Sequence, residues 1–252
     1  MQFATILGLF IGIGGIIVGN LLEGGQIASL IQAAAAFVVF GGTFGALLVA
    51  NRFDDIRRSL ELLRFVFTSP AQSLRKQVAA QIVEAAQLAR RESILALETR
   101  LNTFATPHMR SVFRFLIDGV EPETLKEIFR NEAQQEERRQ MAGARVWMDA
   151  GGFAPTIGII GAILGLIQVM ANLTDTTALG QGIAIAFVAT VYGVGSANLV
   201  FIPIGNKIQR QIKEETNMKY MVIDGAVAII SGLNPYIIQE KLSAYLENEI
   251  IS

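Results

Sequence analysis

The chain has 252 residues, of which 52% are hydrophobic and only 17% are charged, and its mean hydropathy is +0.44. This composition is too apolar for an ordinary soluble domain and indicates insertion into a membrane. A net charge of -1 provides no global field that would attract nucleic acid, and the absence of cysteine excludes a disulfide framework, a thiolate metal site and a cysteine nucleophile.

Four apolar stretches are long enough to cross a bilayer. A spanning helix needs about 20 apolar residues, because each residue advances the helix by about 1.5 Å. None of the four stretches contains a charged residue, and the first lacks the basic segment and the cleavage pattern of a signal peptide, so we expect it to be retained. The predicted spans are Phe3 to Leu22, Ile27 to Ala50, Phe153 to Leu173 and Gly180 to Gly205.

The distribution of basic residues predicts the topology. All 21 Lys and Arg residues lie between Arg52 and Arg145 or between Lys207 and Lys241. Because cytoplasmic loops carry the excess of basic residues, the long middle segment and the C-terminal tail are predicted to face the cytoplasm. The short loops around Glu23 and Asp175 are then external, and both termini are cytoplasmic.

Small residues recur at four-residue spacing in the spans. Such faces allow helix backbones to approach closely. We expect most of these faces to pack within the bundle and some of them to pack against another chain. The sets are Gly8/Gly12, Gly15/Gly19, Gly41/Gly45, Gly161/Gly165, Gly182/Ala186/Thr190 and Ala189/Gly193/Ala197.

The apolar residues of the middle segment recur with a helical period, so this segment is predicted to be helical. Val78, Ile82 and Ala89 lie on one face of a long helix, and the apolar pattern continues to Leu101. Further helices are predicted around Met109 to Ile117, from Pro122 towards the third span, from Lys207 to Lys219 and from Asn234 to Leu246. Gly151-Gly152 is either a flexible junction or a site of close packing.

The predicted fold class is an all-α membrane protein with four transmembrane helices. A large helical cytoplasmic domain separates the second helix from the third, and a C-terminal cytoplasmic helical tail follows the fourth. The predicted segments are 1–50 for transmembrane helices 1 and 2, 51–150 for the cytoplasmic domain, 151–205 for transmembrane helices 3 and 4, and 206–252 for the C-terminal helices.

No predicted span contains Asp, Glu, His, Lys or Arg. Proton relays and ion carriers in membranes normally need an ionisable group at that depth. If this chain conducts an ion, a second chain must therefore supply the titrating group. The sequence has no nucleotide-binding loop and no Ser/His/Asp arrangement, and His108 stands alone without further ligands at metal-binding spacing, so no enzyme and no metal site is indicated.

A few polar and helix-disturbing residues interrupt the third and fourth spans. Pro155 and Pro203 each free a backbone carbonyl, which either faces water or a partner or results only from a kink at a span end. Thr190 either lines a wet path or donates to the carbonyl of Ala186. The other polar candidates are Thr156, Gln168, Gln181, Tyr192, Ser196 and Asn198.

The segments Ala154 to Ile167 and Ile183 to Pro203 resemble the third and fourth spans of MotA-type subunits of bacterial flagellar stators, within the MotA/TolQ/ExbB proton channel family. The segments Ala89 to Glu98 and Asn234 to Leu242 resemble the same subunits. The resemblance covers nearly the whole chain in order.

This resemblance implies a homo-pentamer in the bacterial inner membrane around a dimer of MotB-like single-span B subunits, whose membrane aspartate takes up and releases the ion. It implies that Pro155 and Pro203 couple ion passage to movement and that Arg90 and Glu98 contact the rotor protein FliG. Composition alone instead favours the simpler interpretation that Arg90 and Glu98 lie on a solvent-exposed helix face without a partner. On one continuous helix they would lie about 80° apart. Ser93 stands where many relatives have glycine.

The identity of the ion is predicted from the available ligands. Sodium must be coordinated by oxygen, whereas a proton needs only a carboxylate and a chain of waters. Sodium-type relatives tend to have threonine at the positions of Ala162 and Ala189, with the neighbouring Thr190 kept. The resemblance therefore implies a proton as the transported ion, and no cofactor is expected.

Two other functions fit parts of the sequence. The first is a TolQ/ExbB-like, proton-driven energiser of envelope proteins. Three features argue against it: four spans instead of three, the large insert between the second and third spans, and the resemblance of the stretch from Arg90 to Glu98 to stator subunits. The second is a passive membrane scaffold, whose small-residue faces only assemble a complex and which conducts nothing with a B subunit.

Overall fold

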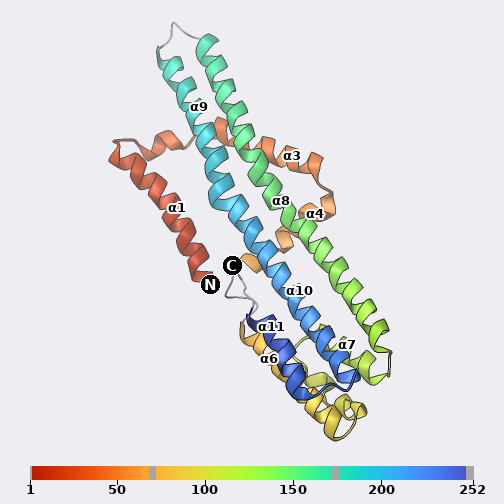
Figure 1. Ribbon diagram of the computed structural model, residues 1–252. Helices are drawn as coiled ribbons and strands as arrows, with labels where there is room; N and C mark the ends of the chain where they lie inside the picture. Colours follow the sequence, from red (N-terminus) through yellow and green to blue (C-terminus); the bar gives the residue numbers. More distant parts are fainter. Residues whose placement is uncertain (1, 68–71, 172–175, 248–252) are drawn as a thin grey trace. The chain divides into compact units, whose positions relative to one another are not determined.

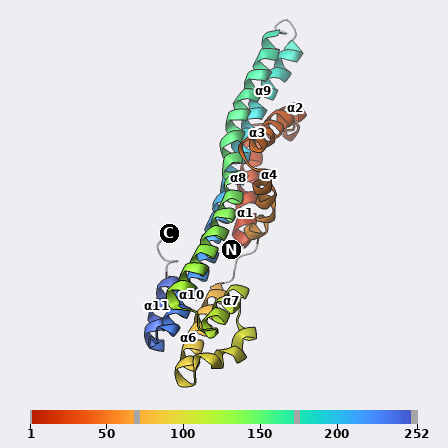
Figure 2. The ribbon, with the colours of Figure 1, turned by 90° about the vertical axis from the view of Figure 1, so that its right-hand side faces the viewer.

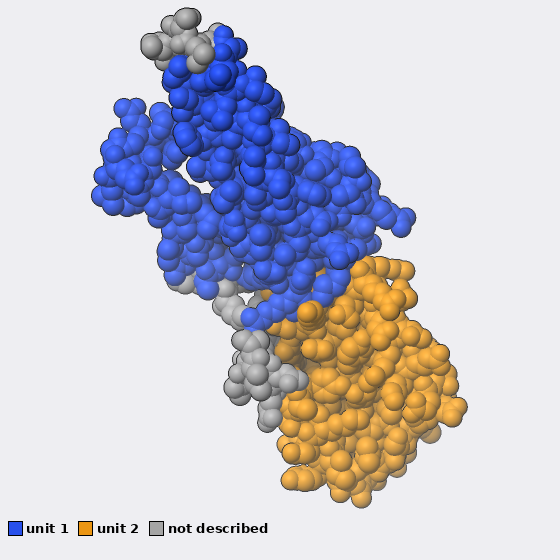
Figure 3. Space-filling view, turned by 45° about the horizontal axis from the view of Figure 1, so that its top comes forward, with its two compact units in different colours: residues 1–69, 140–210 blue, residues 70–139, 211–252 orange. Residues whose placement is uncertain are grey.

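The computed structural model describes residues 2–67, 72–171 and 176–247, and every regular element in these ranges is helical (Figure 1). Four of these helical segments are long and apolar enough to cross a membrane, which confirms the four predicted spans over the described residues. The predicted end of the third span at Leu173 and the predicted loop around Asp175 lie outside the described residues. The chain divides into two compact units, coloured separately in Figure 3: unit 1 comprises Met1–Ser69 and Gln140–Arg210, and unit 2 comprises Pro70–Arg139 and Gln211–Ser252.

The first two spans belong to unit 1. The first is one helix, α1, whereas the second is irregular at its start, where a 3-10 turn is followed by extended backbone at Ile31 and Gln32. Helix then resumes and includes one wider, π-helical turn. The elements are α1 (Gln2–Leu22), η1 (Ile27–Leu30), α2 (Ala33–Ala36), η2 (Phe37–Gly41) and α3 (Gly42–Ala50).

The third and fourth spans belong to two long, nearly continuous helical rods that lie side by side in Figures 1 and 2. The first rod is α8 (Pro122–Ala171), a helix of 50 residues that continues through Gly151-Gly152 without interruption. Gly151 is buried, and a methyl group there would collide with the side chain of Ile202, so close packing explains this residue. The second rod consists of α9 (Thr176–Ser196), the π-helical turn η4 (Ala197–Phe201) and α10 (Ile202–Ile230).

Part of the predicted cytoplasmic segment 51–150 lies in unit 1. This part includes α4 (Phe53–Glu61) and α5 (Arg64–Phe67). The indole Nε1 of Trp147 on α8 donates to the carbonyl of Ser59 on α4 at 3.1 Å. The predicted segment boundaries at 50 and 150 therefore do not coincide with the boundaries of the compact units.

Unit 2 has one apolar core, and six helical elements pack around it. These are α6 (Gln72–Arg91), η3 (Ile94–Thr103), α7 (Pro107–Ile117), the first part of α8, the second part of α10 and α11 (Pro235–Glu247). The largest fully buried side chains of this core are Ile82, Leu97, Met109, Phe113, Leu116, Leu125, Met221, Ile223, Ile238 and Leu242.

The prediction of one long helix from Val78 to Leu101 was wrong. Helix α6 ends at Arg91, Ser93 has extended backbone, and the 3-10 helix η3 packs back on α6. This reversal buries Leu97 completely in the core that also contains Ile82. The side chain of Gln81 then bridges the two elements, since its amide donates to the Thr103 carbonyl at 3.1 Å and its oxygen accepts from the Ala105 N–H at 2.9 Å.

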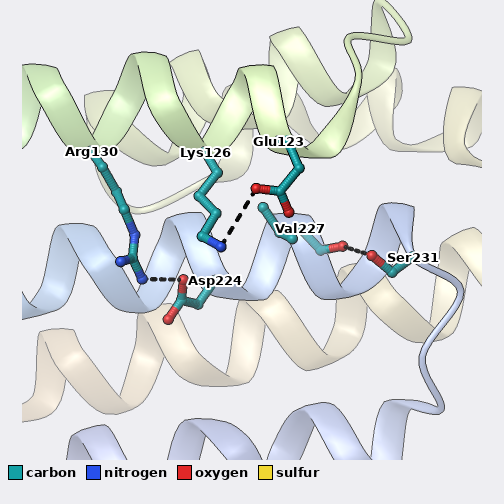
Figure 4. A network of polar contacts seen from close by, with 6 residues as sticks. All are labelled: Glu123, Lys126, Arg130, Asp224, Val227 and Ser231. Carbon is teal, nitrogen blue, oxygen red and sulfur yellow. Dashed lines mark hydrogen bonds and ion pairs between the residues drawn. The ribbon is translucent and has the colours of Figure 1, made fainter.

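A polar network joins α8, α10 and α11 in unit 2. The guanidinium of Arg130 pairs with one carboxylate oxygen of Asp224 at 2.9 Å, as Figure 4 shows. The Tyr245 hydroxyl donates to the other oxygen at 2.6 Å, and the guanidinium lies 5.5 Å from the centre of the Tyr220 ring. Asp224 is therefore the shared acceptor that connects the C-terminal helix to the two rods.

Candidate functional site

The candidate site lies where α8 and α9 meet, because most of the predicted path residues lie on these two helices. Glycine and alanine bring the two backbones into direct contact. A methyl group at Gly158 would lie 2.9 Å from the carbonyl oxygen of Ala189, one at Gly165 would lie 2.8 Å from that of Gly182, and one at Gly193 would lie 2.5 Å from that of Ala154. No water fits between surfaces this close, so any path along this pair uses the faces turned away from the contact.

Other small-residue faces remain open within the described chain. A methyl group at Gly8, Gly15, Gly19, Gly41 or Gly45 would meet no atom within 4 Å. Gly12 is different, because Leu199 of η4 packs against it. The small residues of the third and fourth spans thus pack within the chain, as expected, while most of those in the first two spans have no such contact.

The two alanines of the ion prediction differ in their surroundings. Ala189 is fully buried and belongs to an apolar cluster with Ala35 and Val39 of the second span. It also meets α8, since a methyl group at Gly161 would lie 2.7 Å from its Cβ. Ala162 is only partly buried. A threonine hydroxyl at 189 would therefore enter a three-helix contact.

Pro155 lies inside α8, and Thr156 follows it on an exposed part of the helix. Because proline has no N–H, the carbonyl of Gly151 lacks its usual helical donor. The Thr156 hydroxyl donates to the Phe153 carbonyl at 2.8 Å. Its oxygen keeps lone pairs that are able to accept a hydrogen bond from water or a partner.

Pro203 lies in the first turn of α10, immediately after the π-helical turn η4. It supplies no N–H to the carbonyl of Leu199, and its ring would clash with that carbonyl in a regular α-helix. The wider turn at Ala197–Phe201 is the local change expected of a helix that accommodates such a residue. Pro203 itself is exposed.

Thr190 is half-buried on α9, and its hydroxyl lies 3.3 Å from the Ala186 carbonyl. The sequence predicted this hydrogen bond as the alternative to a path-lining role for Thr190. The bond uses the hydroxyl proton and leaves the oxygen as an acceptor. Thr190 and Thr156 are therefore both able to accept a hydrogen bond, but their contacts do not bring them together.

Tyr192 connects α9 to the irregular start of the second span. Its hydroxyl donates to the Leu30 carbonyl at 2.6 Å and accepts from the Gln32 N–H at 3.2 Å. Its ring stacks on Phe40, with centroids 5.9 Å apart. These contacts satisfy backbone groups that the break at Ile31 leaves without helical partners. The sequence suggested a path-lining residue and gave no signal of this bridging contact, because the break itself was not predicted.

Thr43 is a polar residue of the second span and is not among the predicted path residues. Its side chain is only 2% exposed, and its hydroxyl has no hydrogen-bond partner among the described residues. Threonine on a helix commonly donates to a carbonyl of the preceding turn, so a sequence pattern gives no reason to single it out. Over the described ranges, no group of three His, Cys, Asp or Glu residues is placed to hold a metal.

Arg90 and Glu98 lie on different elements of unit 2. Arg90 is in the last turn of α6 and Glu98 is on η3, so the angle calculated for one continuous helix does not apply. Both side chains are exposed, and neither has an ion-pair or hydrogen-bond partner in the described part of the chain. A cavity of about 260 Å³ lies between the two elements, and its lining includes Glu84, Arg91 and Arg100.

Comparison with known proteins covers the whole chain. Residues 6–93 match the family model "Motility protein A N-terminal", and residues 96–221 match "MotA/TolQ/ExbB proton channel family". Motility protein A of Bacillus subtilis is 31% identical over 98% of this chain and 91% of its own length. The chemotaxis protein PomA of Vibrio alginolyticus is 30% identical over 98% of this chain and 96% of its own.

Two solved structures have the same fold. The structure of C. jejuni MotAB matches with a TM-score of 0.92 and 28% identity over 100% of this chain and 98% of that one. The flagellar MotAB stator complex from Bacillus subtilis matches with a TM-score of 0.88 and 31% identity over 97% and 96%. The two family models and the relatives of similar length point to the same family. The chain belongs to the MotA/TolQ/ExbB proton channel family.

Proposed function

We propose that this chain is the A subunit of a bacterial flagellar stator, which forms an ion channel with a MotB-like B subunit and converts ion flow into torque on the rotor. The observation that carries the proposal is the end-to-end match to motility proteins, together with the fold shared with two MotAB complexes. The TolQ/ExbB-like and scaffold functions receive no comparable support, because the relatives that match 98% of the chain are motility and chemotaxis proteins.

The spans support a division of labour between two chains. They contain no Asp, Glu, His, Lys or Arg, so the group that binds and releases the ion belongs to the B subunit, where we expect an aspartate. The α8/α9 pair supplies a rigid wall with acceptors at Thr156 and Thr190. Pro155 removes one backbone N–H inside the continuous helix α8, and Pro203 follows the π-helical turn of the second rod.

We further propose that the ion is a proton. The side chain of Ala189 supplies no oxygen ligand at the contact between α8, α9 and the second span, and the side chain of Ala162 supplies none on the partly exposed face. A carboxylate on the partner and a chain of waters suffice for a proton, whereas sodium would need additional oxygen ligands.

The proposed assembly is a homo-pentamer around a B dimer in the inner membrane, with both termini in the cytoplasm. The open glycines Gly15, Gly19, Gly41 and Gly45 of the first two spans are available for contacts between copies. Arg90 and Glu98 are exposed on unit 2 and are proposed to contact FliG.

One experiment tests the function directly. The chain is co-expressed with its candidate B subunit in a bacterium that lacks stators, and swimming is measured with and without sodium. Rotation that continues without sodium and stops when a protonophore is added is the expected result. A B subunit whose membrane aspartate is replaced by asparagine is the matched control and should not restore rotation. Absence of rotation with a B subunit that assembles correctly would contradict the proposal.

A further inference from the structure

A cavity in unit 1 lies outside the α8/α9 contact. Its volume is about 320 Å³, and it is formed by the start of α1, by Val66 of α5 and by the junction of η4 with α10. Leu9, Val66 and Ile204 make much of its wall apolar. Gly8 keeps it open, because a methyl group at this position would meet no atom within 4 Å.

The cavity contains one basic side chain, that of Lys207. Its ammonium group donates a hydrogen bond to the hydroxyl of Thr5, and it forms no ion pair in the described part of the chain. Both side chains are half-buried. The Thr5 hydroxyl accepts from Lys207 and keeps its own proton available for a second acceptor. A phosphate oxygen placed here would receive two donors, one of them charged.

The combination of an apolar wall and an unpaired cation indicates the chemistry of the occupant. Lys207 lies two residues beyond the predicted end of the fourth span, at the depth where lipid headgroups meet the acyl region. An anionic phospholipid carries a phosphate for the cation and an acyl chain for the apolar wall. Inorganic phosphate has no part that covers the wall, and a zwitterionic lipid carries its own cation beside the phosphate.

We propose that this cavity, between the start of α1 and the start of α10, binds an anionic phospholipid. Lys207 and Thr5 hold the headgroup phosphate, and the upper part of an acyl chain fills the space beside Gly8. The site goes beyond the stator function and does not depend on it, since lipid binding requires neither ion flow nor a rotor.

The test measures lipid retention by the intact complex with its B subunit. Detergent-purified complex is incubated with phosphatidylglycerol or with phosphatidylcholine, and bound lipid is counted by native mass spectrometry. The natural chain is expected to retain phosphatidylglycerol preferentially. Lys207→Gln and Gly8→Leu should each reduce this retention about tenfold, because one removes the charge and the other fills the space, whereas Lys207→Arg should preserve it.

Two matched controls separate the site from general effects. Lys213→Gln removes an exposed lysine of the same helix, and Gly14→Leu enlarges a glycine of α1 that has open space around it and does not line the cavity. Neither should change lipid retention. The proposal is overturned if the natural chain retains both lipids equally, or if Lys207→Gln and Gly8→Leu both retain phosphatidylglycerol normally. Loss of the B subunit instead of lipid from Lys207→Gln would assign the cavity to the partner chain and would also overturn it.

Discussion

Tyr192 is the residue that connects the fourth span to the broken start of the second. Replacing it with phenylalanine keeps the ring on Phe40 and removes the hydroxyl that serves Leu30 and Gln32. Because unpaired backbone groups in a membrane protein have no easy substitute partners, Tyr192→Phe should lower the free energy of unfolding by about 1–3 kcal/mol.

The thermal unfolding midpoint of the detergent-solubilised complex measures this effect. Tyr236→Phe is the matched control, because Tyr236 is 73% exposed and should tolerate the change. An unchanged midpoint for Tyr192→Phe would show that the bridging contact contributes no stability.

His108 gives unit 2 a predictable response to acid. Burial, followed by the positive charge of nearby Lys219, lowers the pKa of His108 from 6.5 to about 4, although a hydrogen bond with the Lys219 backbone opposes the shift. The unfolded chain therefore binds the proton more readily. The contribution of neutral, buried His108 to the free energy of unfolding is therefore complete above about pH 6.5 and is lost as the pH falls towards about 4.

We expect the free energy of unfolding to fall by on the order of 2 kcal/mol between pH 7.5 and pH 5 from this residue. His108→Gln removes the titrating group and should flatten that part of the stability profile. Denaturant unfolding of both proteins at the two pH values provides the comparison. Equal slopes with and without the histidine would exclude it as the source.

At the scale of elements, the contact between α8 and α9 depends on glycines that have no room for a side chain. A methyl group at Gly193 would lie 2.5 Å from the Ala154 carbonyl, so Gly193→Ala should destabilise the helix pair by about 1–3 kcal/mol and impair rotation. Gly195→Ala is the matched control, because a methyl group two residues further along the same helix would meet nothing within 4 Å. Swimming speed and the unfolding midpoint should change only for Gly193→Ala.

The C-terminal helix α11 is attached partly through the hydrogen bond between Tyr245 and Asp224. Tyr245→Phe removes that bond and leaves the pair between Arg130 and Asp224 intact. Since a hydrogen bond to a charged acceptor contributes about 1.5–3 kcal/mol, α11 should detach more often. Trypsin cleavage after Lys241, an exposed residue of α11, should then become faster, whereas Tyr236→Phe on the same helix should leave the rate unchanged.

The elements also show what could be predicted from the sequence. The four spans, α7 and the start of α8 were predicted because apolar length, helical period and proline position are local signals. The break after Arg91 was not predicted, because it depends on Leu97 entering a core formed by distant helices and on the contacts of Gln81 with η3. In the candidate site, the hydrogen bond between Thr190 and Ala186 followed from spacing, whereas the bridge from Tyr192 to Leu30 joins residues 162 positions apart and required the fold.

At the scale of the whole molecule, the proposed function assigns torque transfer to exposed charges of unit 2. Reversing Arg90 or Glu98, as in Arg90→Glu or Glu98→Lys, should weaken the contact with the rotor by about 1 kcal/mol per charge. Rotation should slow while the amount of B subunit that copurifies stays the same. Arg110→Glu reverses another exposed charge of unit 2 and is the control. Normal rotation in both reversed variants would remove these residues from the rotor contact.

The spans of this chain contain no Asp, Glu, His, Lys or Arg, and this has a consequence for the cell that makes it. A ring built from these helices alone offers a proton no place to bind within the membrane, and its tightest helix contact excludes water. Copies produced before the partner arrives would therefore not discharge the ion gradient. Under the proposed function, conduction would begin only with the chain that supplies the acid, and the supply of that chain would limit the number of open channels.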